Sequence, residues 1–211
     1  MVKISASLLS ARDNLEKTIE EINNLDIDYI HLDIMDGKFV PNTSFTYEEI
    51  KTIVSSINKP LDVHLMVKDI DEYIYNYAML NTDYITFHYE TIHSLKTIKK
   101  IKDYGIKCGI AIKPNTNVEE IYDLLPYIDL VLVMSVEPGK GGQKFIDGSQ
   151  DKIKKLKDKI KFLDLHVVVS VDGGINDTTA ELCKASGVDI LVIGSALTNS
   201  DNKREFVNNV K

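Results

Sequence analysis

The stretch HLDIMDG, residues 31–37, begins like an ordinary buried strand and then places a histidine and two carboxylates among its aliphatic residues. Because side chains alternate between the two faces of a strand, His31 and Asp33 point one way and their aliphatic neighbours point the other. Burying an unpaired carboxylate costs several kcal/mol. We therefore expect other strands to bring a partner to Asp33, whereas Asp36 and Gly37 predict a turn just past the strand.

Short apolar runs rich in β-branched residues recur eight times along the chain. They are KISASL (3–8), DYIHLD (28–33), PLDVHLM (60–66), DYITFH (83–88), IKCGIAI (106–112), DLVLVM (129–134), HVVVSVD (166–172) and DILVIG (189–194). Each is followed by a segment that predicts a helix, over residues 13–24, 47–56, 70–78, 93–104, 118–125, 149–161, 177–185 and 201–210. Gly105 and Gly187 each stand between a helix and a strand, which is typical of helix C-termini.

This alternation predicts an α/β protein with a parallel sheet covered by helices. Eight strands are the number that closes into a barrel filled by its own side chains, so we expect a single-domain (β/α)8 TIM barrel over residues 1–211. An open doubly wound sheet is the alternative. In both architectures, ligands bind beyond the C-terminal ends of the strands.

The composition argues against several classes of partner. The formal net charge of -7 argues against nucleic-acid binding, because nucleic-acid-binding proteins usually carry a basic surface. The two cysteines, Cys108 and Cys183, are far apart and have no CxxC spacing, which disfavours a disulfide framework or zinc ribbon and fits a reducing cytoplasm. The N-terminal sequence MVKISASLLSARDN does not resemble a secretory signal, and no apolar run approaches the ~18 residues of a membrane span. We expect a cytoplasmic protein without nucleic-acid or membrane partners.

Ionisable residues also stand near the ends of two further runs, as His64 in the third and Asp172 in the seventh. Two histidines and two aspartates from three strand ends can converge on the barrel axis. Imidazole and carboxylate ligands suit a divalent transition metal such as zinc, iron or manganese, which would neutralise both acids. Each residue alone is also compatible with a core histidine or a helix cap, and it is their common predicted layer that favours a metal site.

Glycines follow the last three predicted strands, in PGKGGQ (138–143), DGGI (172–175) and GS (194–195). Each could be only a tight turn, because glycine tolerates positive φ. The loops after strands seven and eight are, however, where TIM barrels bind phosphate through backbone N–H groups. Their position therefore predicts a small phosphorylated ligand.

Seven stretches along the chain resemble the ribulose-phosphate 3-epimerases, a family of TIM-barrel metalloenzymes. They are SLLS (7–10), HLDIMDGKFVPN (31–42), DVHLMV (62–67), TFHYE (86–90), MSVEPGKGGQKF (134–145), VDGGI (171–175) and GSA (194–196). The resemblance implies a barrel of the ribulose-phosphate-binding type and an isomerase that interconverts D-ribulose 5-phosphate and D-xylulose 5-phosphate in the pentose phosphate pathway. It also implies one divalent metal ion, zinc, iron, manganese or cobalt, with zinc the first expectation, and a phosphorylated ketose as substrate.

The resemblance further implies a role for each matching residue. The metal ligands would be His31, Asp33, His64 and Asp172, with Asp33 as the proton acceptor and Asp172 as the proton donor. The positions that hold the substrate or its phosphate are matched by Ser7, His64, Gly139, Lys140, Gly141, Gly142, Asp172, Gly173, Gly174, Gly194 and Ser195. Met35, Met66 and Met134 match a set that lines the site, although their spacing alone would place them in the core. His88 and Glu90 match positions that either support the ligands or simply pack.

The implied reaction accounts for this arrangement. Inverting a carbon next to a ketone requires removal of its proton from one face and return of a proton to the other, so two acid–base groups must flank a planar intermediate. Lys140 departs from the family, which usually has phenylalanine there. This lysine could reach the phosphate or point to solvent, and both remain open.

Three alternative functions remain. A D-allulose 6-phosphate 3-epimerase of the same family would share the metal site. A Schiff-base aldolase would use Lys113, at the end of the fifth predicted strand. A phosphosugar-binding protein without catalysis would need the glycine loops but not two opposed carboxylates. Association into a homo-oligomer is a further expectation that the sequence cannot locate on the surface.

Overall fold

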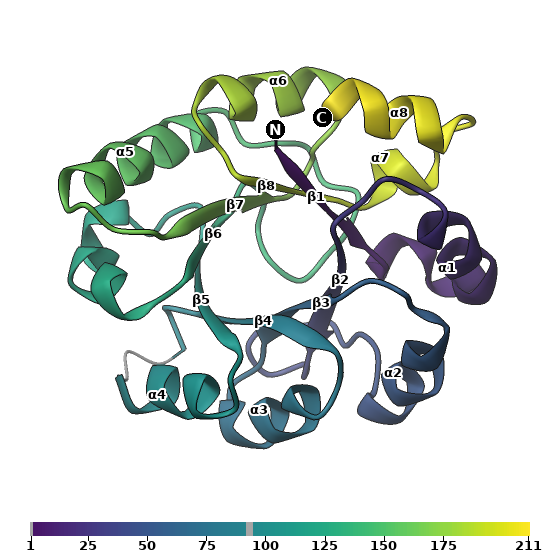
Figure 1. Ribbon diagram of the computed structural model, residues 1–211, viewed down its shortest axis with the longest axis horizontal. Helices are drawn as coiled ribbons and strands as arrows, with labels where there is room; N and C mark the ends of the chain where they lie inside the picture. Colours follow the sequence, from purple (N-terminus) through teal and green to yellow (C-terminus); the bar gives the residue numbers. More distant parts are fainter. Residues whose placement is uncertain (1, 92–94) are drawn as a thin grey trace.

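Eight parallel strands, found within residues 2–91 and 95–211, which are those that the computed structural model describes, form a closed barrel (Figure 1). They are β1 Lys3–Ser7, β2 Tyr29–Met35, β3 Leu61–Met66, β4 Thr82–His88, β5 Lys107–Ile112, β6 Leu130–Met134, β7 Val168–Asp172 and β8 Ile190–Ile193. Each strand pairs with the next, and β8 pairs with β1. The predicted TIM barrel is confirmed, and the open sheet is excluded.

Helices surround the barrel and follow the strands in turn (Figure 1). The α-helices are α1 Leu15–Asn23, α2 Tyr47–Ile53, α3 Ile70–Ala78, α4 Leu95–Asp103, α5 Ser149–Phe162, α6 Asp177–Ala185, α7 Ser195–Thr198 and α8 Lys203–Val210. Short 3-10 helices are η1 Leu9–Asn14, η2 Val54–Ser56 and η3 Val118–Tyr127. No helix in the described parts of the chain is long and apolar enough to cross a membrane.

The predicted helices differ from the observed ones in a few places. The segment expected over 118–125 is a 3-10 helix that contains Pro126, whose ring cannot donate a backbone hydrogen bond. The helix expected from residue 93 is observed from Leu95 to Asp103, and its expected start at His93 lies outside the described residues. Two short elements, η1 and α7, were not predicted.

Two apolar regions support the barrel. The outward residues of the strands, such as Ile30 and Leu32 of β2, pack against the helices in the main core. A smaller apolar core contains Tyr29 and Tyr84, whose rings meet edge to face with centroids 5.7 Å apart. The inward positions of β2 thus pass from an apolar base to His31 and Asp33, as strand alternation predicts.

Candidate active site

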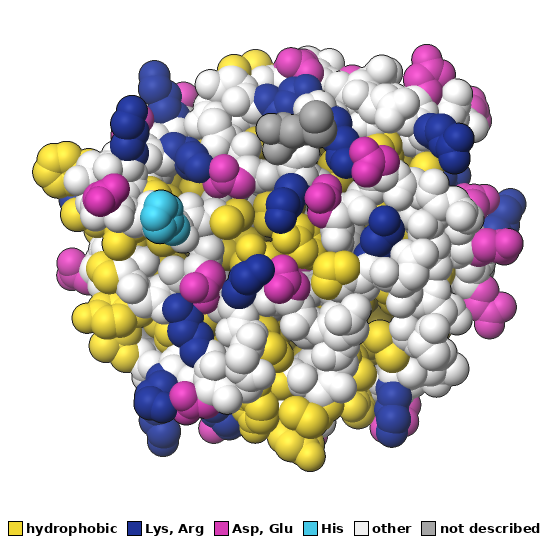
Figure 2. All heavy atoms as spheres, in the orientation of Figure 1, with side chains coloured by type: hydrophobic (Ala, Val, Ile, Leu, Met, Phe, Trp, Pro, Cys, Tyr) yellow, Lys and Arg dark blue, Asp and Glu magenta, His cyan; other side chains and the backbone are white. Residues whose placement is uncertain are grey.

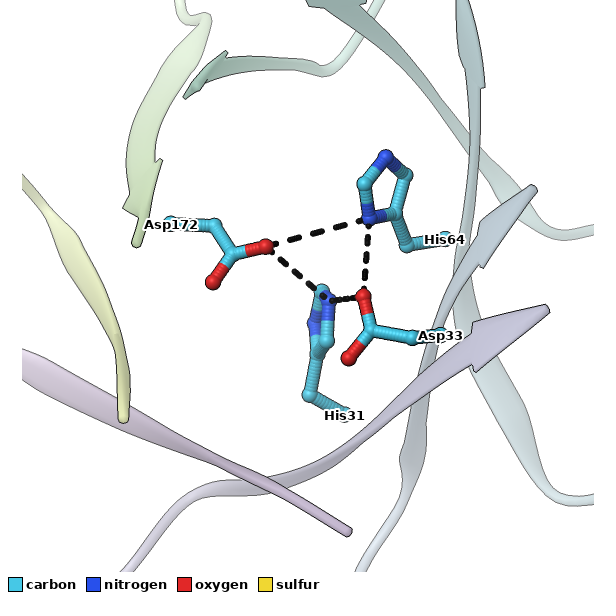
Figure 3. A group of neighbouring side chains, drawn as sticks. All are labelled: His31, Asp33, His64 and Asp172. Carbon is cyan, nitrogen blue, oxygen red and sulfur yellow. Dashed lines mark hydrogen bonds and ion pairs between the residues drawn. The ribbon is translucent and has the colours of Figure 1, made fainter. Parts of the chain in front are cut away.

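Three strands bring four ionisable side chains to one point inside the barrel (Figure 3). The strands are β2, which carries His31 and Asp33, β3, which carries His64, and β7, which ends at Asp172. Parallel pairing sets Asp33 directly beside His64. One ligand atom from each residue lies within 4.8 Å of those of the others. The structure therefore brings together the four residues that the sequence singled out.

The two carboxylates face the same pair of imidazoles. Asp33 Oδ1 lies 3.3 Å from His31 Nε2 and 3.1 Å from His64 Nδ1. Asp172 Oδ2 lies 4.0 Å and 3.9 Å from the same two nitrogens (Figure 3). The centre of this group is thus surrounded by two nitrogens and two oxygens, a donor set that suits a divalent transition metal.

His31 provides a direct test of whether a cation fits this cluster. Its Nδ1 lies 2.8 Å from Asp62 Oδ2, and the same oxygen accepts a hydrogen bond from Ser5 Oγ at 2.9 Å. Its Nε2 is fully buried and makes no hydrogen bond, because the nearby Asp33 Oδ1, 3.3 Å away, does not have hydrogen-bond geometry. Burying an imidazole nitrogen without a partner is costly, and a metal bond at Nε2 would satisfy it. The four residues fit a metal ion.

The electrostatics separate the two acids. Burial raises the pKa of Asp172 to about 6, and the Asp33 carboxylate adds to this rise. Burial also opposes ionisation of Asp33, but the His31 and His64 imidazoles outweigh it and lower the pKa of Asp33 well below its usual range. The two carboxyl groups therefore differ in acidity, and Asp172 takes up a proton at a higher pH than Asp33 does.

A second chain of contacts leads away from His64. Its Nε2 lies 2.9 Å from His88 Nε2, and His88 Nδ1 lies 3.1 Å from Glu90 Oε2. Burial lowers the pKa of His88 to about 4. Burial opposes ionisation of Glu90, but hydrogen bonds from His88, the Lys113 backbone and Thr116 lower its pKa to about 2. His88 thus contacts one residue of the cluster, His64, and Glu90 contacts His88, which gives both residues a place that the sequence left open.

A cavity that is partly open to solvent lies over the cluster. Asp33 and Asp172 line it together with residues expected to hold substrate, Ser7, Gly139, Lys140, Gly141, Gly142, Gly173, Gly174, Gly194 and Ser195. The three methionines expected to line the site, Met35, Met66 and Met134, do so as well. His31 and His64 are fully buried and are not part of this lining. Ser7 Oγ donates a 2.9 Å hydrogen bond to Asp33 Oδ2, so Ser7 orients this carboxylate.

Glycine backbone shapes the loops around the cavity. Gly174 has φ +64°, and a Cβ there would lie 2.3 Å from the backbone nitrogen of Phe145. Gln143 closes the loop after β6, because its side-chain amide donates to the carbonyls of Glu137 at 2.6 Å and Lys140 at 2.8 Å. Lys140 is exposed and is the cationic side chain among the residues that line the cavity.

Lys113 stands apart from this arrangement. Its Nζ lies 4.3 Å from the centroid of the Phe39 ring, and the residue does not line the cavity. A Schiff-base nucleophile must reach the substrate carbonyl, so this position gives no support to the aldolase alternative.

Sequence reasoning missed Asp62 and Ser5, which support His31 from behind. A signal was present, because Asp62 stands two residues before His64 in the same strand and must point the same way. A carboxylate beside a metal-binding histidine is a common means of fixing the ring.

Comparisons with known proteins identify the family of this chain. A model of the ribulose-phosphate 3 epimerase family matches residues 3–198. A protein named ribulose-phosphate 3-epimerase from Bacillus subtilis (strain 168) is 37% identical over 216 residues, which cover 100% of this chain and 99% of that protein. A protein of the same name from Methanocaldococcus jannaschii is 39% identical over 213 residues, covering 100% and 90%.

Solved structures of more distant proteins share the fold alone. KGPDC from Streptococcus mutans gives a TM-score of 0.69 at 16% identity, covering 100% of this chain and 95% of that one. 3-Hexulose-6-phosphate synthase from Salmonella typhimurium gives 0.62 at 18% identity, covering 99% and 96%. With the family model and the full-length relatives in agreement, this chain belongs to the ribulose-phosphate 3-epimerase family of isomerases.

Proposed function

We propose that this protein is a metal-dependent epimerase that interconverts D-ribulose 5-phosphate and D-xylulose 5-phosphate by proton transfer at C3. The observation that carries the proposal is the meeting of Asp33 and Asp172, from separate strands, at one cluster able to hold a metal below a cavity. Binding alone would not require two carboxylates with separated acidities.

Asp33 and Asp172 have different roles in proton transfer because their acidities differ. Asp33 is ionised and takes the proton from C3, which produces a planar enediolate. Asp172, whose pKa burial raises to about 6, takes up a proton far more readily than Asp33 and delivers it to the other face. In the reverse direction the two acids exchange roles.

His31, Asp33, His64 and Asp172 would hold one divalent ion, with zinc the first choice over iron, manganese and cobalt. When bound, the ion supplies positive charge that stabilises the enediolate by several kcal/mol. Met35, Met66 and Met134 line the cavity, and their thioethers offer no competing proton to the intermediate.

The phosphate group is proposed to sit against the glycine loops. Gly173, Gly174, Gly194 and Ser195 line the cavity and can offer backbone N–H groups to an anion. Lys140 lies at the same cavity and would add a positive charge, which favours the phosphate-binding interpretation of this residue over the solvent-pointing one.

Exchange and turnover measurements test the proposal. Metal-loaded protein in D₂O should introduce deuterium at C3 of D-ribulose 5-phosphate and form D-xylulose 5-phosphate, and a chelator should stop both. Comparing kcat/KM for this substrate and D-allulose 6-phosphate should favour the pentulose. Absence of C3 exchange in metal-loaded protein would favour the binding-protein alternative, and cleavage of a C–C bond with borohydride labelling of Lys113 would favour the aldolase.

We further propose a cytoplasmic location and no nucleic-acid partner. Cys108 and Cys183 are both buried free thiols, as a reducing compartment permits. Figure 2 shows Lys and Arg side chains interspersed with Asp and Glu on the face in view. Assembly into a homo-oligomer stays a prediction, to be measured by light scattering.

A further inference from the structure

The imidazoles of His64 and His88 contact each other through their Nε2 atoms, which lie 2.9 Å apart. Both residues are fully buried, His64 on β3 and His88 at the end of β4. At this distance one nitrogen must donate a hydrogen and the other must accept it. The pair therefore has two possible arrangements of protons, and only one of them leaves His64 Nδ1 free to bind a cation.

Glu90 selects between these arrangements. Its Oε1 accepts hydrogen bonds from the backbone N–H of Lys113 at 2.8 Å and from the hydroxyl of Thr116. Its Oε2 lies 3.1 Å from His88 Nδ1. A carboxylate oxygen can only accept, so His88 must carry its hydrogen on Nδ1.

The loop behind Glu90 is itself held in place. The Nζ of Lys152, on α5, donates hydrogen bonds to the carbonyl oxygens of Lys113 at 3.2 Å, Pro114 at 2.5 Å and Thr116 at 2.6 Å. The two donors to Glu90 Oε1 come from the same loop. The orientation of the carboxylate toward His88 is thus set by contacts outside the metal cluster.

The proton positions then follow in sequence. With its hydrogen on Nδ1, neutral His88 presents a lone pair at Nε2, so His64 must donate its Nε2–H to it. His64 Nδ1, which lies 3.1 Å from Asp33 Oδ1, is then left with a lone pair. A lone pair facing a carboxylate oxygen is satisfied only by a cation that binds both atoms, so this proton arrangement belongs to the metal-bound protein. His31 also presents a lone pair to the cluster, but from Nε2 rather than Nδ1. Asp62 accepts a hydrogen bond from His31 Nδ1, so the hydrogen is on Nδ1 and Nε2 has none.

We propose that Glu90 is a positioning residue that acts through His88 to hold His64 in the form that binds metal through Nδ1. The proposal rests on the metal-dependent function proposed above and adds to it a residue that touches neither metal nor substrate. It assigns the His88–Glu90 pair to proton placement rather than to packing.

The Glu90→Gln variant tests this directly. Its amide oxygen must remain at the Oε1 side, where Lys113 and Thr116 donate, so its NH₂ group faces His88 Nδ1. His88 then carries its hydrogen on Nε2, and His64 is driven to carry one on Nδ1. We expect the dissociation constant for zinc, measured by competition with a chromogenic chelator, to rise roughly 10- to 100-fold.

Thr116→Val is the matched control, because it removes a partner of Oε1 and leaves the Oε2 contact with His88 intact. It should keep the wild-type zinc affinity and histidine tautomers. Unchanged zinc affinity in Glu90→Gln would overturn the proposal, and so would an equal loss of affinity in Thr116→Val.

Nitrogen-15 NMR of labelled histidines gives a readout that needs no turnover, and its wild-type measurement needs no variant. Zinc-loaded wild-type protein should show His88 protonated at Nδ1 and His64 protonated at Nε2, and Glu90→Gln should show His88 protonated at Nε2. A wild-type His88 that carries its hydrogen on Nε2 would contradict the proposal. A protein that binds no divalent ion would instead refute the proposed function, while the wild-type His88 tautomer would still decide the role of Glu90.

Discussion

Asp33 and Asp172 acquire different acidities within one small cluster because their surroundings differ. Asp33 accepts a hydrogen bond from Ser7 and faces His31 and His64 at 3.3 Å and 3.1 Å, whereas Asp172 stands farther from both rings. Stronger contacts with potential cations favour the ionised form of Asp33, and burial with weaker compensation favours the protonated form of Asp172. A base and an acid thus arise from the same residue type.

We predict that Asp33→Asn and Asp172→Asn each lower kcat by about 10²–10⁴-fold, since each removes one of the two proton-transfer groups. Bound metal should be measured in every sample, because both residues are also proposed ligands. Near-normal turnover in either variant, at full metal content, would refute the two-base assignment.

Lys140 carries a separate prediction at the cavity rim. If its ammonium group binds the phosphate, Lys140→Ala should lower kcat/KM roughly 10-fold, mainly through KM, because the phosphate is remote from the reacting carbon. The effect should shrink at high salt. Lys144→Ala, an exposed lysine of the same loop that does not line the cavity, is the control. A loss confined to kcat would indicate loop closure rather than phosphate binding.

At the scale of the elements, the glycine after β7 is constrained in two ways. Gly174 and Gly105 both have positive φ, +64° and +77°, but a Cβ at Gly105 meets nothing within 4 Å, whereas one at Gly174 meets the Phe145 backbone. We predict that Gly174→Ala lowers the free energy of unfolding by roughly 1–3 kcal/mol more than Gly105→Ala, because only the former adds a clash to the backbone strain. Urea unfolding of both variants gives the comparison, and equal losses would show that the loop moves without cost.

The strands could be predicted closely from the sequence because each is a buried apolar run bounded by polar residues or glycine. Element boundaries were less certain where local chemistry competes with periodicity. The segment 118–127 has helical spacing, but Pro126 lies inside it and the observed conformation is 3-10. The short helices η1 and α7 are too brief to show a period.

The four cluster residues of the site were predictable because they interrupt the apolar pattern of the strands. Strand alternation and the common layer pointed to His31, Asp33, His64 and Asp172, which the structure brings together. The supporting residues were not found, because Asp62 contacts His31 from a neighbouring strand and Ser5 contacts Asp62 from a third. The position of Asp62 two residues before His64 indicates its direction but not its partner. Only the register between neighbouring strands specifies which buried polar side chains meet.

At the scale of the whole molecule, closure of the barrel forces charged groups into its interior. Because β2, β3 and β7 belong to one closed ring, their inward side chains share a restricted space that water enters poorly. The two carboxylates there repel each other, their contacts with the two imidazoles offset this only in part, and His31 Nε2 has no hydrogen-bond partner. The unloaded barrel therefore holds a destabilised cluster that a cation would satisfy.

Metal binding should consequently stabilise the entire fold. A ligand at 1,000 times its dissociation constant adds about 4.1 kcal/mol when it binds only the native state. For a chain of this size each kcal/mol raises Tm by roughly 2–4 °C, so saturating zinc should raise Tm by about 8–16 °C over chelator-treated protein. Differential scanning calorimetry measures the shift. Asp172→Asn should show a much smaller one because it lacks a ligand, whereas Glu119→Gln, which neutralises an acid paired with Lys155 on the surface, should retain it. An equal shift in Asp172→Asn would mean that the stabilising cation binds somewhere other than the strand-end cluster.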